Sequence, residues 1–293
     1  MAELKPYKGN YYLWEYVPSK PAGLVFAILY ALATVVIVWR IVRTKTLFSI
    51  AFAVGGIFET LGYAVRAIAE DKTDQLGIYI MQSILILVAP ALFAASLYMV
   101  LGRLMRSIHG ERHSLIPIKW LTRAFVIGDI FSFLVQSTGG GLMGTSGFDP
   151  KTGQNIILAG LFIQIAMFGL FIVTSAVFDV RMRRWPSRAS LESGRRWKNI
   201  MAMLYTTSAL IMLRSVFRVI EYVMGKEGYL LKNEWTLYVF DAVPILLVMI
   251  LYAVIYPGEL RASNLNKPRD MDELESDSVN TTGDLEHGGR EMK

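Results

Sequence analysis

Seven long apolar segments constrain the fold of this chain more than any other feature of its sequence. Each has at least the roughly 20 residues that an α-helix needs to cross a bilayer, and the third, fifth and sixth exceed that length, so they should tilt or project. Because the bilayer interior offers no water to backbone amides, a spanning segment of this length must form a helix. The sequence therefore predicts an all-α membrane protein with seven transmembrane helices. The segments cover about 21–40, 47–69, 76–105, 118–138, 155–180, 198–224 and 235–256.

The residue composition narrows the class of protein further. Of the 293 residues, 54% are hydrophobic and 18% are charged, whereas soluble domains carry about 25% charged residues. The chain has no cysteine, which excludes disulfides and cysteine-ligated zinc. Its three histidines, His109, His113 and His287, lie outside the apolar segments, which argues against a histidine-ligated metal or haem centre in the membrane. We therefore expect that the protein has no cofactor and is not an enzyme.

The distribution of basic residues predicts the orientation in the membrane. Twenty of the 30 lysines and arginines lie in the tail or near the loops that follow the first, third and fifth segments, and seven lie on the opposite side. The positive-inside rule places the richer side in the cytosol. We therefore expect an extracellular segment at 1–20, a transmembrane domain at 21–257 and a cytosolic tail at 258–293. The acidic, polar composition of that tail predicts disorder.

Charged residues inside the sixth segment form a distinct pattern. Arg214, Arg218 and Glu221 follow i, i+4, i+7 spacing, which places them on one face of a helix. A charged side chain at the bilayer centre costs roughly 2.5–3.5 kcal/mol on insertion scales. We therefore expect at least one of the three to pair with a carboxylate from the second or seventh segment.

Other segments supply partners for this face. The second and seventh segments repeat the same spacing, and the third and fourth add amides and a carboxylate. Polar residues gather in the predicted outer half, which favours an outward-opening substrate cavity. The alternative is a set of buried pairs that lock the helices together. The candidate substrate-binding residues are Glu59, Tyr63, Arg66, Gln82, Asp129, Gln136, Arg214, Arg218, Glu221, Tyr238 and Asp241.

Prolines and glycines mark irregular positions. Pro90 and Pro244 interrupt the third and seventh segments, and each predicts either a broken helix that supports gating or a static kink. The glycine run at 139–144, Gly-Gly-Gly-Leu-Met-Gly, lacks the GK[ST] ending of a phosphate-binding loop. We interpret the run as a flexible connector on the outer face.

A weak internal repeat suggests how the helices are arranged. A shift of 159 residues places Phe58 on Phe217 and Tyr63 on Tyr222. The same register makes Glu59 and Arg218 counterparts. Few positions are identical, so chance also explains the match. If the repeat is genuine, it implies a 3+1+3 parallel arrangement of the kind found in transporters.

Several of these motifs together resemble those of the fungal RTA-like lipid-translocating exporters. They comprise the stretch from Glu59 to Arg66, Ala89-Pro90-Ala91-Leu92, Asp129 with Gln136 and the glycines that follow, the stretch from Arg214 to Glu221, and Glu234…Tyr238…Asp241…Pro244. The similarity covers about 20–257. It implies a seven-helix protein associated with sphingoid-base export, sterol-like drug resistance or porphyrin transport.

The resemblance and the buried charges together predict a transporter of amphipathic lipids, such as sphingoid long-chain bases or sterol-like compounds, in the plasma membrane. An amine head group would pair with Glu59, Asp129 or Asp241. The alternatives are a seven-helix receptor for a lipid-like ligand and a porphyrin or haem transporter. We expect amphipathic small molecules and membrane lipids as partners and no nucleic acid, while the oligomeric state stays open.

Overall fold

A computed structural model describes most of the predicted membrane domain. It covers residues 6, 12, 14, 16–111, 114–115, 117–143, 150–193, 195–225, 228–258 and 260. The predicted disordered tail lies almost wholly outside the described residues, as does most of the predicted extracellular segment. The described ranges contain helices, turns and loops but no strand.

The helices match the predicted segments. Seven are long and apolar enough to cross a membrane, which confirms the predicted fold class. The seventh of these, Glu234–Val254, combines three consecutive helical elements. The elements are α1 (Lys20–Thr44), a 3-10 helix (Leu47–Ser49), α2 (Ile50–Ala69), α3 (Leu76–Ser107), α4 (Ile118–Met143), α5 (Pro150–Arg184), α6 (Arg188–Ser193), α7 (Arg195–Met224), α8 (Tyr229–Lys232), α9 (Glu234–Leu237), a π-helix (Tyr238–Ala242) and α10 (Val243–Val254).

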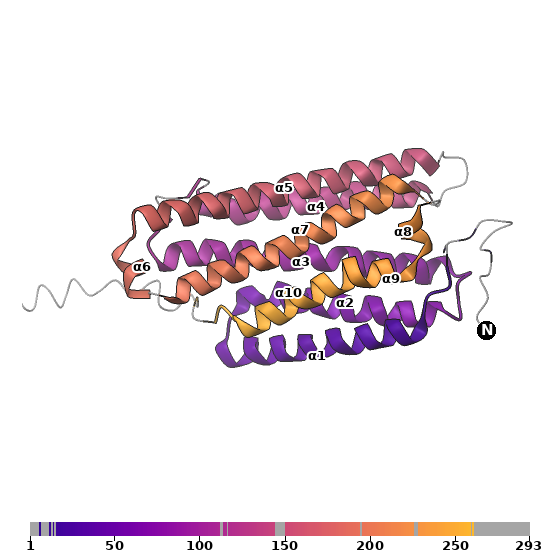
Figure 1. Ribbon diagram of the computed structural model, residues 1–293, viewed down its shortest axis with the longest axis horizontal. Helices are drawn as coiled ribbons and strands as arrows, with labels where there is room; N and C mark the ends of the chain where they lie inside the picture. The colour runs from indigo at the N-terminus through magenta and orange to yellow at the C-terminus, as the bar shows by residue number, and fades with distance from the viewer. Residues whose placement is uncertain are drawn as a thin grey trace, which may run out of the picture. The chain divides into compact units, whose positions relative to one another are not determined.

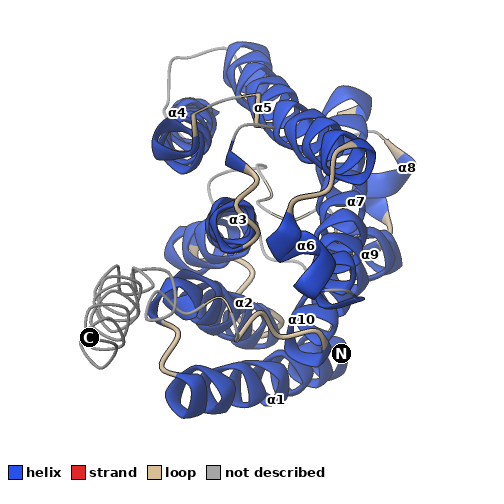
Figure 2. Cartoon of the chain, turned by 90° about the vertical axis from the view of Figure 1, so that its left-hand side faces the viewer, coloured by secondary structure: helices blue, strands red, loops and turns tan. Residues whose placement is uncertain are grey.

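The long helices run side by side along one direction (Figure 1). Seen end-on, α4 and α5 form one pair, while α1, α2 and α10 lie together on the other side of α3 (Figure 2). The helix α7 packs against α5 and α10 and so joins the two sides. Residues from several segments can therefore meet around α3 and α7.

Aromatic side chains fill the space between α2, α3 and α10. The Phe52 ring stacks on Tyr252 with 3.8 Å between ring centroids and lies 4.5 Å from Phe93. All three side chains are buried. By contrast, α1 exposes a run of large aliphatic side chains, among them Val35 and Val42. Contiguous exposed apolar surface of this kind is typical of a face that contacts lipid.

The glycine run forms part of a helix, so its interpretation as a flexible connector was wrong. The helix α4 continues through Gly139–Gly141 to Met143. A Cβ atom on Gly139 would lie 2.7 Å from the carbonyl oxygen of Gly153 in α5. The missing side chain therefore lets α4 and α5 approach closely, as small residues do between membrane helices.

The two prolines occupy different environments. Pro90 lies within α3, which continues on both sides of it. Pro244 instead follows the π-helix at Tyr238–Ala242 and occupies the first turn of α10. A π-helix inserts extra backbone into one turn and is frequent at functional sites. The irregular backbone near Pro244 thus lies directly at Asp241.

The predicted orientation is open to a labelling experiment, because the chain has no native cysteine. Tyr229 is 60% exposed in α8, and Arg188 is exposed at the opposite end of the long helices. We expect Tyr229→Cys to react with an impermeant maleimide in intact cells, and Arg188→Cys to react only after permeabilisation. The reverse labelling pattern would contradict the predicted topology.

Candidate functional site

A buried ion-pair network joins α7 to the π-helix. The Nε atom of Arg214 and the Nη2 atom of Arg218 donate to the two carboxylate oxygens of Asp241. Asp241 is 1% exposed. One carboxylate thus pairs with two guanidinium groups, and the predicted pairing between the sixth and seventh segments is confirmed.

One further nitrogen of each arginine donates to another partner. The Nη2 atom of Arg214 donates to the carbonyl oxygen of Ile86 in α3 at 2.9 Å. The Nη1 atom of Arg218 donates to Glu221 at 3.0 Å. Burying charges is favourable only where pairing and hydrogen bonds offset their desolvation. These contacts supply such partners and tie α3, α7 and the π-helix together.

A third arginine, Arg66, is buried and binds the segment that precedes α1. The Nη2 atom of Arg66 donates to Glu234 and to the Tyr16 hydroxyl, each at 2.8 Å. Its Nε atom donates to the Tyr238 hydroxyl at 3.2 Å. Burial raises the pKa of Tyr16, although the charge of Arg66 acts in the opposite direction, so Tyr16 stays protonated at neutral pH.

Two further contacts complete this group. The Arg66 guanidinium lies 5.5 Å from the Trp14 ring centroid, a cation–π distance. The backbone amide of Ser19 donates to both carboxylate oxygens of Glu234, each at 3.0 Å. We call this set the Arg66 clamp; it comprises Trp14, Tyr16, Ser19, Arg66, Glu234 and Tyr238.

Glu59 differs from the other acidic residues of the site. Its side chain is 1% exposed, yet neither carboxylate oxygen has a hydrogen-bond partner among the described residues. Arg214 and Asp241 are close enough for their charges to act on it. The repeat suggested Arg218 as its direct partner, but Arg218 binds Asp241 and Glu221 instead. Glu59 is therefore a buried acceptor that lacks a donor.

Two tyrosines, Tyr30 and Tyr63, are close enough to Glu59 for its charge to act on them. Tyr63 lies one turn after Glu59 on α2, and its hydroxyl also lacks a partner within the described part of the chain. The Tyr63 ring stacks on Tyr30, with 5.2 Å between centroids. The Tyr30 hydroxyl donates to the carbonyl oxygen of Ala242 at 2.7 Å, which fixes the ring against the π-helix.

Asp129 and Gln136 belong to a separate polar group between α3, α4 and α5. The Tyr98 hydroxyl donates to Asp129 at 2.9 Å. The Gln136 amide donates to Ser132 at 2.9 Å and to Gln164 at 3.1 Å. Interhelical hydrogen bonds of this type hold membrane helices together, which favours the structural interpretation for this group.

The contacts thus divide ten of the eleven predicted site residues into two sets, and Gln82 is assigned to neither. Gln82 lies on α3 one turn before Ile86, and its buried carbonyl oxygen has no partner among the described residues. Sequence reasoning missed the aromatic partners Trp14, Tyr16, Tyr30 and Tyr98. Only the first two had a sequence signal, the aromatic character of the N-terminal segment. The set around α2, α7 and the π-helix contains Glu59, Tyr63, Arg66, Arg214, Arg218, Glu221, Tyr238 and Asp241.

Comparison with known proteins finds relatives in Saccharomyces cerevisiae. Protoporphyrin uptake protein 1 of Saccharomyces cerevisiae is 37% identical over 84% of this chain and 92% of its own length. Protein RTA1 of the same species is 33% identical, over 85% and 86%. A sphingoid long-chain base transporter, RSB1, is 26% identical, over 92% and 80%.

No solved structure matches the chain. The family model described as RTA1 like protein matches residues 52–264, which is more than half of the chain and includes every candidate substrate-binding residue predicted from the sequence. The chain, an integral membrane protein with seven transmembrane helices, therefore belongs to the RTA1-like protein family.

Proposed function

We propose that this chain transports an amphipathic lipid with a cationic head group, such as a sphingoid long-chain base, across the plasma membrane. The names of two relatives, one for protoporphyrin uptake and one for sphingoid base transport, support membrane transport as the class of function. The observation that favours a cationic cargo is Glu59, a buried carboxylate without a hydrogen-bond donor. Intramembrane ionisable residues commonly mark substrate or ion pathways.

The surroundings of Glu59 suit an ammonium group. A protonated amine supplies three donors, which the carboxylate and the Tyr63 hydroxyl are placed to accept. The stacked rings of Tyr30 and Tyr63 add an aromatic surface of the kind that attracts cations. Charge-assisted hydrogen bonds of this type are roughly twice as strong as neutral ones. The alkyl chain of the cargo would then lie along apolar helix faces.

The site is closed in this structure, so transport requires a movement that opens it. Glu59 and Asp241 are buried, and the Arg66 clamp holds the segment before α1 against Glu234. The π-helix at Tyr238–Ala242 lies between Glu234 and Pro244. A shift of this irregular element would move Asp241 and Tyr238 together. We therefore place the opening movement at the π-helix.

A liposome assay tests this proposal. Purified protein in vesicles with a fluorescent sphingoid base should move the lipid between leaflets faster than protein-free vesicles do. We expect Glu59→Gln to lower the initial rate about ten- to hundredfold, since hydrogen bonds to charged groups contribute roughly 1.5–3 kcal/mol. Wild-type rates equal to those of protein-free vesicles would favour the receptor interpretation instead.

If Glu59 instead had a structural role, Glu59→Gln would lower thermal stability together with transport. Removing a buried carboxylate that has no partner should leave thermal stability unchanged or raise it, because its desolvation is not compensated. We therefore expect Glu59→Gln to lose transport without losing stability. The matched control is Asp71→Asn, which removes an exposed carboxylate paired with Lys20 and should leave both quantities unchanged.

A tetrapyrrole is the second candidate cargo, favoured by the 37% identity to a protein named for protoporphyrin uptake. The carboxylates of a tetrapyrrole would bind an arginine rather than Glu59. Arg218 is the candidate, because its buried Nε atom has no partner among the described residues. For such a cargo, Glu59→Gln should leave uptake unchanged and Arg218→Gln should abolish it. The same two variants should show the opposite order of sensitivity with a sphingoid base.

A further inference from the structure

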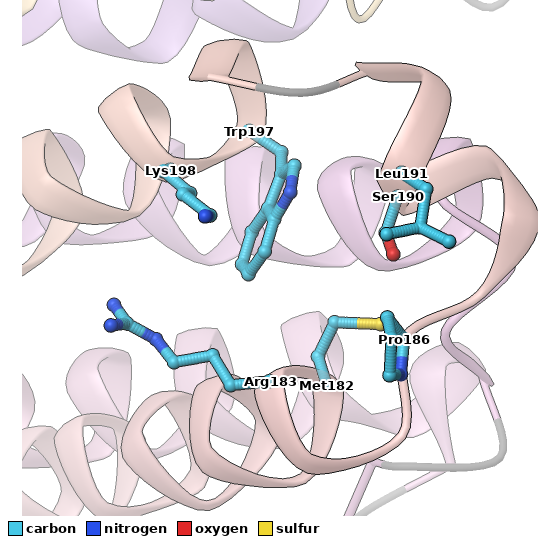
Figure 3. Close-up of a pocket in the computed structure, with 7 residues that line it drawn as sticks. All are labelled: Met182, Arg183, Pro186, Ser190, Leu191, Trp197 and Lys198. Atoms are coloured by element: carbon cyan, nitrogen blue, oxygen red, sulfur yellow. The ribbon is translucent and has the colours of Figure 1, made fainter.

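A pocket of about 350 Å³ lies where α5 ends and α7 begins, beside the short helix α6 (Figure 3). It lies at the end of the long helices opposite to α8 and α9 (Figure 1). Its volume falls within the range of small-molecule sites, about 300–1,000 Å³. The proposed transport function makes no use of this pocket.

One end of the pocket is cationic. The side chains of Arg183 in α5 and Lys198 in α7 extend toward the same space (Figure 3). The Nε atom of Arg183 donates to Asp179 at 2.9 Å, which leaves its two Nη atoms for another acceptor. Lys198 forms no ion pair within the described ranges. Two cationic side chains thus converge here, and Asp179 is the carboxylate that pairs with one of them.

The other end of the pocket is apolar. Met182 and Pro186 lie opposite Leu191, and the Trp197 indole separates this end from the cationic one (Figure 3). Trp197 is 4% exposed, so its ring is fixed, while Leu191 is 67% exposed. The exposed side chain extends the apolar surface beyond the pocket. A ligand that matches this lining has an anionic group joined to a hydrocarbon portion.

We propose that this pocket binds the head group of an anionic phospholipid from the adjacent leaflet. The phosphate lies between Arg183 and Lys198, and the glycerol and upper acyl carbons lie over Trp197 and Leu191. Basic pockets between transmembrane helices on the cytosolic side are suited to such head groups. The predicted topology places this pocket on that side, where anionic lipids are concentrated.

Native mass spectrometry of the purified full chain, loaded from mixed micelles of phosphatidylserine and phosphatidylcholine, tests the proposal. Wild-type protein should retain phosphatidylserine in preference to phosphatidylcholine. Each basic residue near an anionic surface contributes about fivefold to binding, so the charge reversal Lys198→Glu should weaken retention about thirtyfold. Leu191→Ser should weaken it less, because it removes only apolar contact.

The matched control is Arg184→Glu. Arg184 carries the same charge one residue from Arg183 but does not line the pocket, so this reversal should leave retention unchanged. Equal losses in Lys198→Glu and Arg184→Glu would show general surface attraction and overturn the site. Displacement by equimolar glycerol 3-phosphate would overturn the lipid assignment, since the soluble head group lacks the hydrocarbon portion.

Discussion

Replacing Asp241 by asparagine should destabilise this protein more than any other single loss of charge in the membrane region. The carboxylate of Asp241 binds Arg214 and Arg218 at once. Its removal leaves Arg218 paired with Glu221 and leaves Arg214 without a carboxylate partner among the described residues. Breaking a buried pair costs roughly 3–5 kcal/mol, which lowers the midpoint of thermal unfolding by about 6–20 °C for a chain of this size. Size-exclusion chromatography of detergent-solubilised protein after stepwise heating measures this shift.

Two variants separate this effect from a general intolerance of polar changes. Asp129→Asn removes a buried carboxylate that accepts a hydrogen bond from Tyr98, so it should cost much less. Arg214→Gln combined with Asp241→Asn leaves Arg218 with Glu221 and should recover part of the lost stability. An Asp241→Asn variant as stable as wild type would contradict the shared ion pair.

Replacing Arg66 by methionine should release the segment before α1. Arg66 binds Glu234, Tyr16 and Tyr238, and Glu234 in turn accepts the backbone amide of Ser19. Methionine keeps an apolar side chain of similar length but makes none of these hydrogen bonds. Loss of a buried arginine with several partners should raise local opening about hundredfold. Hydrogen exchange at the Ser19 amide measures this opening.

Lys20→Gln is the control for the Arg66 clamp. It breaks the pair between Lys20 and Asp71, in which both side chains are more than half exposed, and exposed pairs contribute only about 0–1 kcal/mol. Exchange at Ser19 should therefore stay near the wild-type rate in this variant. Unchanged exchange in Arg66→Met would show that the clamp does not hold the segment.

The sequence was sufficient to predict which charged residues share a helix face. Helical spacing placed Arg214, Arg218 and Glu221 together, and the cost of burying charge required a carboxylate partner. Asp241 was the correct partner because it lies on a helix that packs against α7. Apolar length alone likewise predicted all seven spans, since the bilayer permits few alternatives.

The sequence was not sufficient to predict distances between helices. Glu59 and Arg218 were expected as counterparts, but which side chains meet depends on helix rotation and depth, which periodicity leaves undetermined. For the same reason, the sequence could not predict that Asp129 and Gln136 form a polar group separate from the other site residues. The π-helix was not predicted either. Pro244 indicates that the seventh helix is irregular, but it does not specify the conformation of the residues before it. Three inferences from the sequence stay predictions: the orientation in the membrane, the internal repeat and the outward-opening substrate cavity.

The central claim is that Glu59 receives the cationic head group of the cargo. A structure of the purified protein determined by electron cryomicroscopy with a saturating sphingoid base tests it most directly. We predict density for the amine within about 3 Å of the Glu59 carboxylate, with the π-helix displaced from its position in the closed state. Lipid density bound elsewhere, with Glu59 still enclosed and without a partner, would contradict the claim.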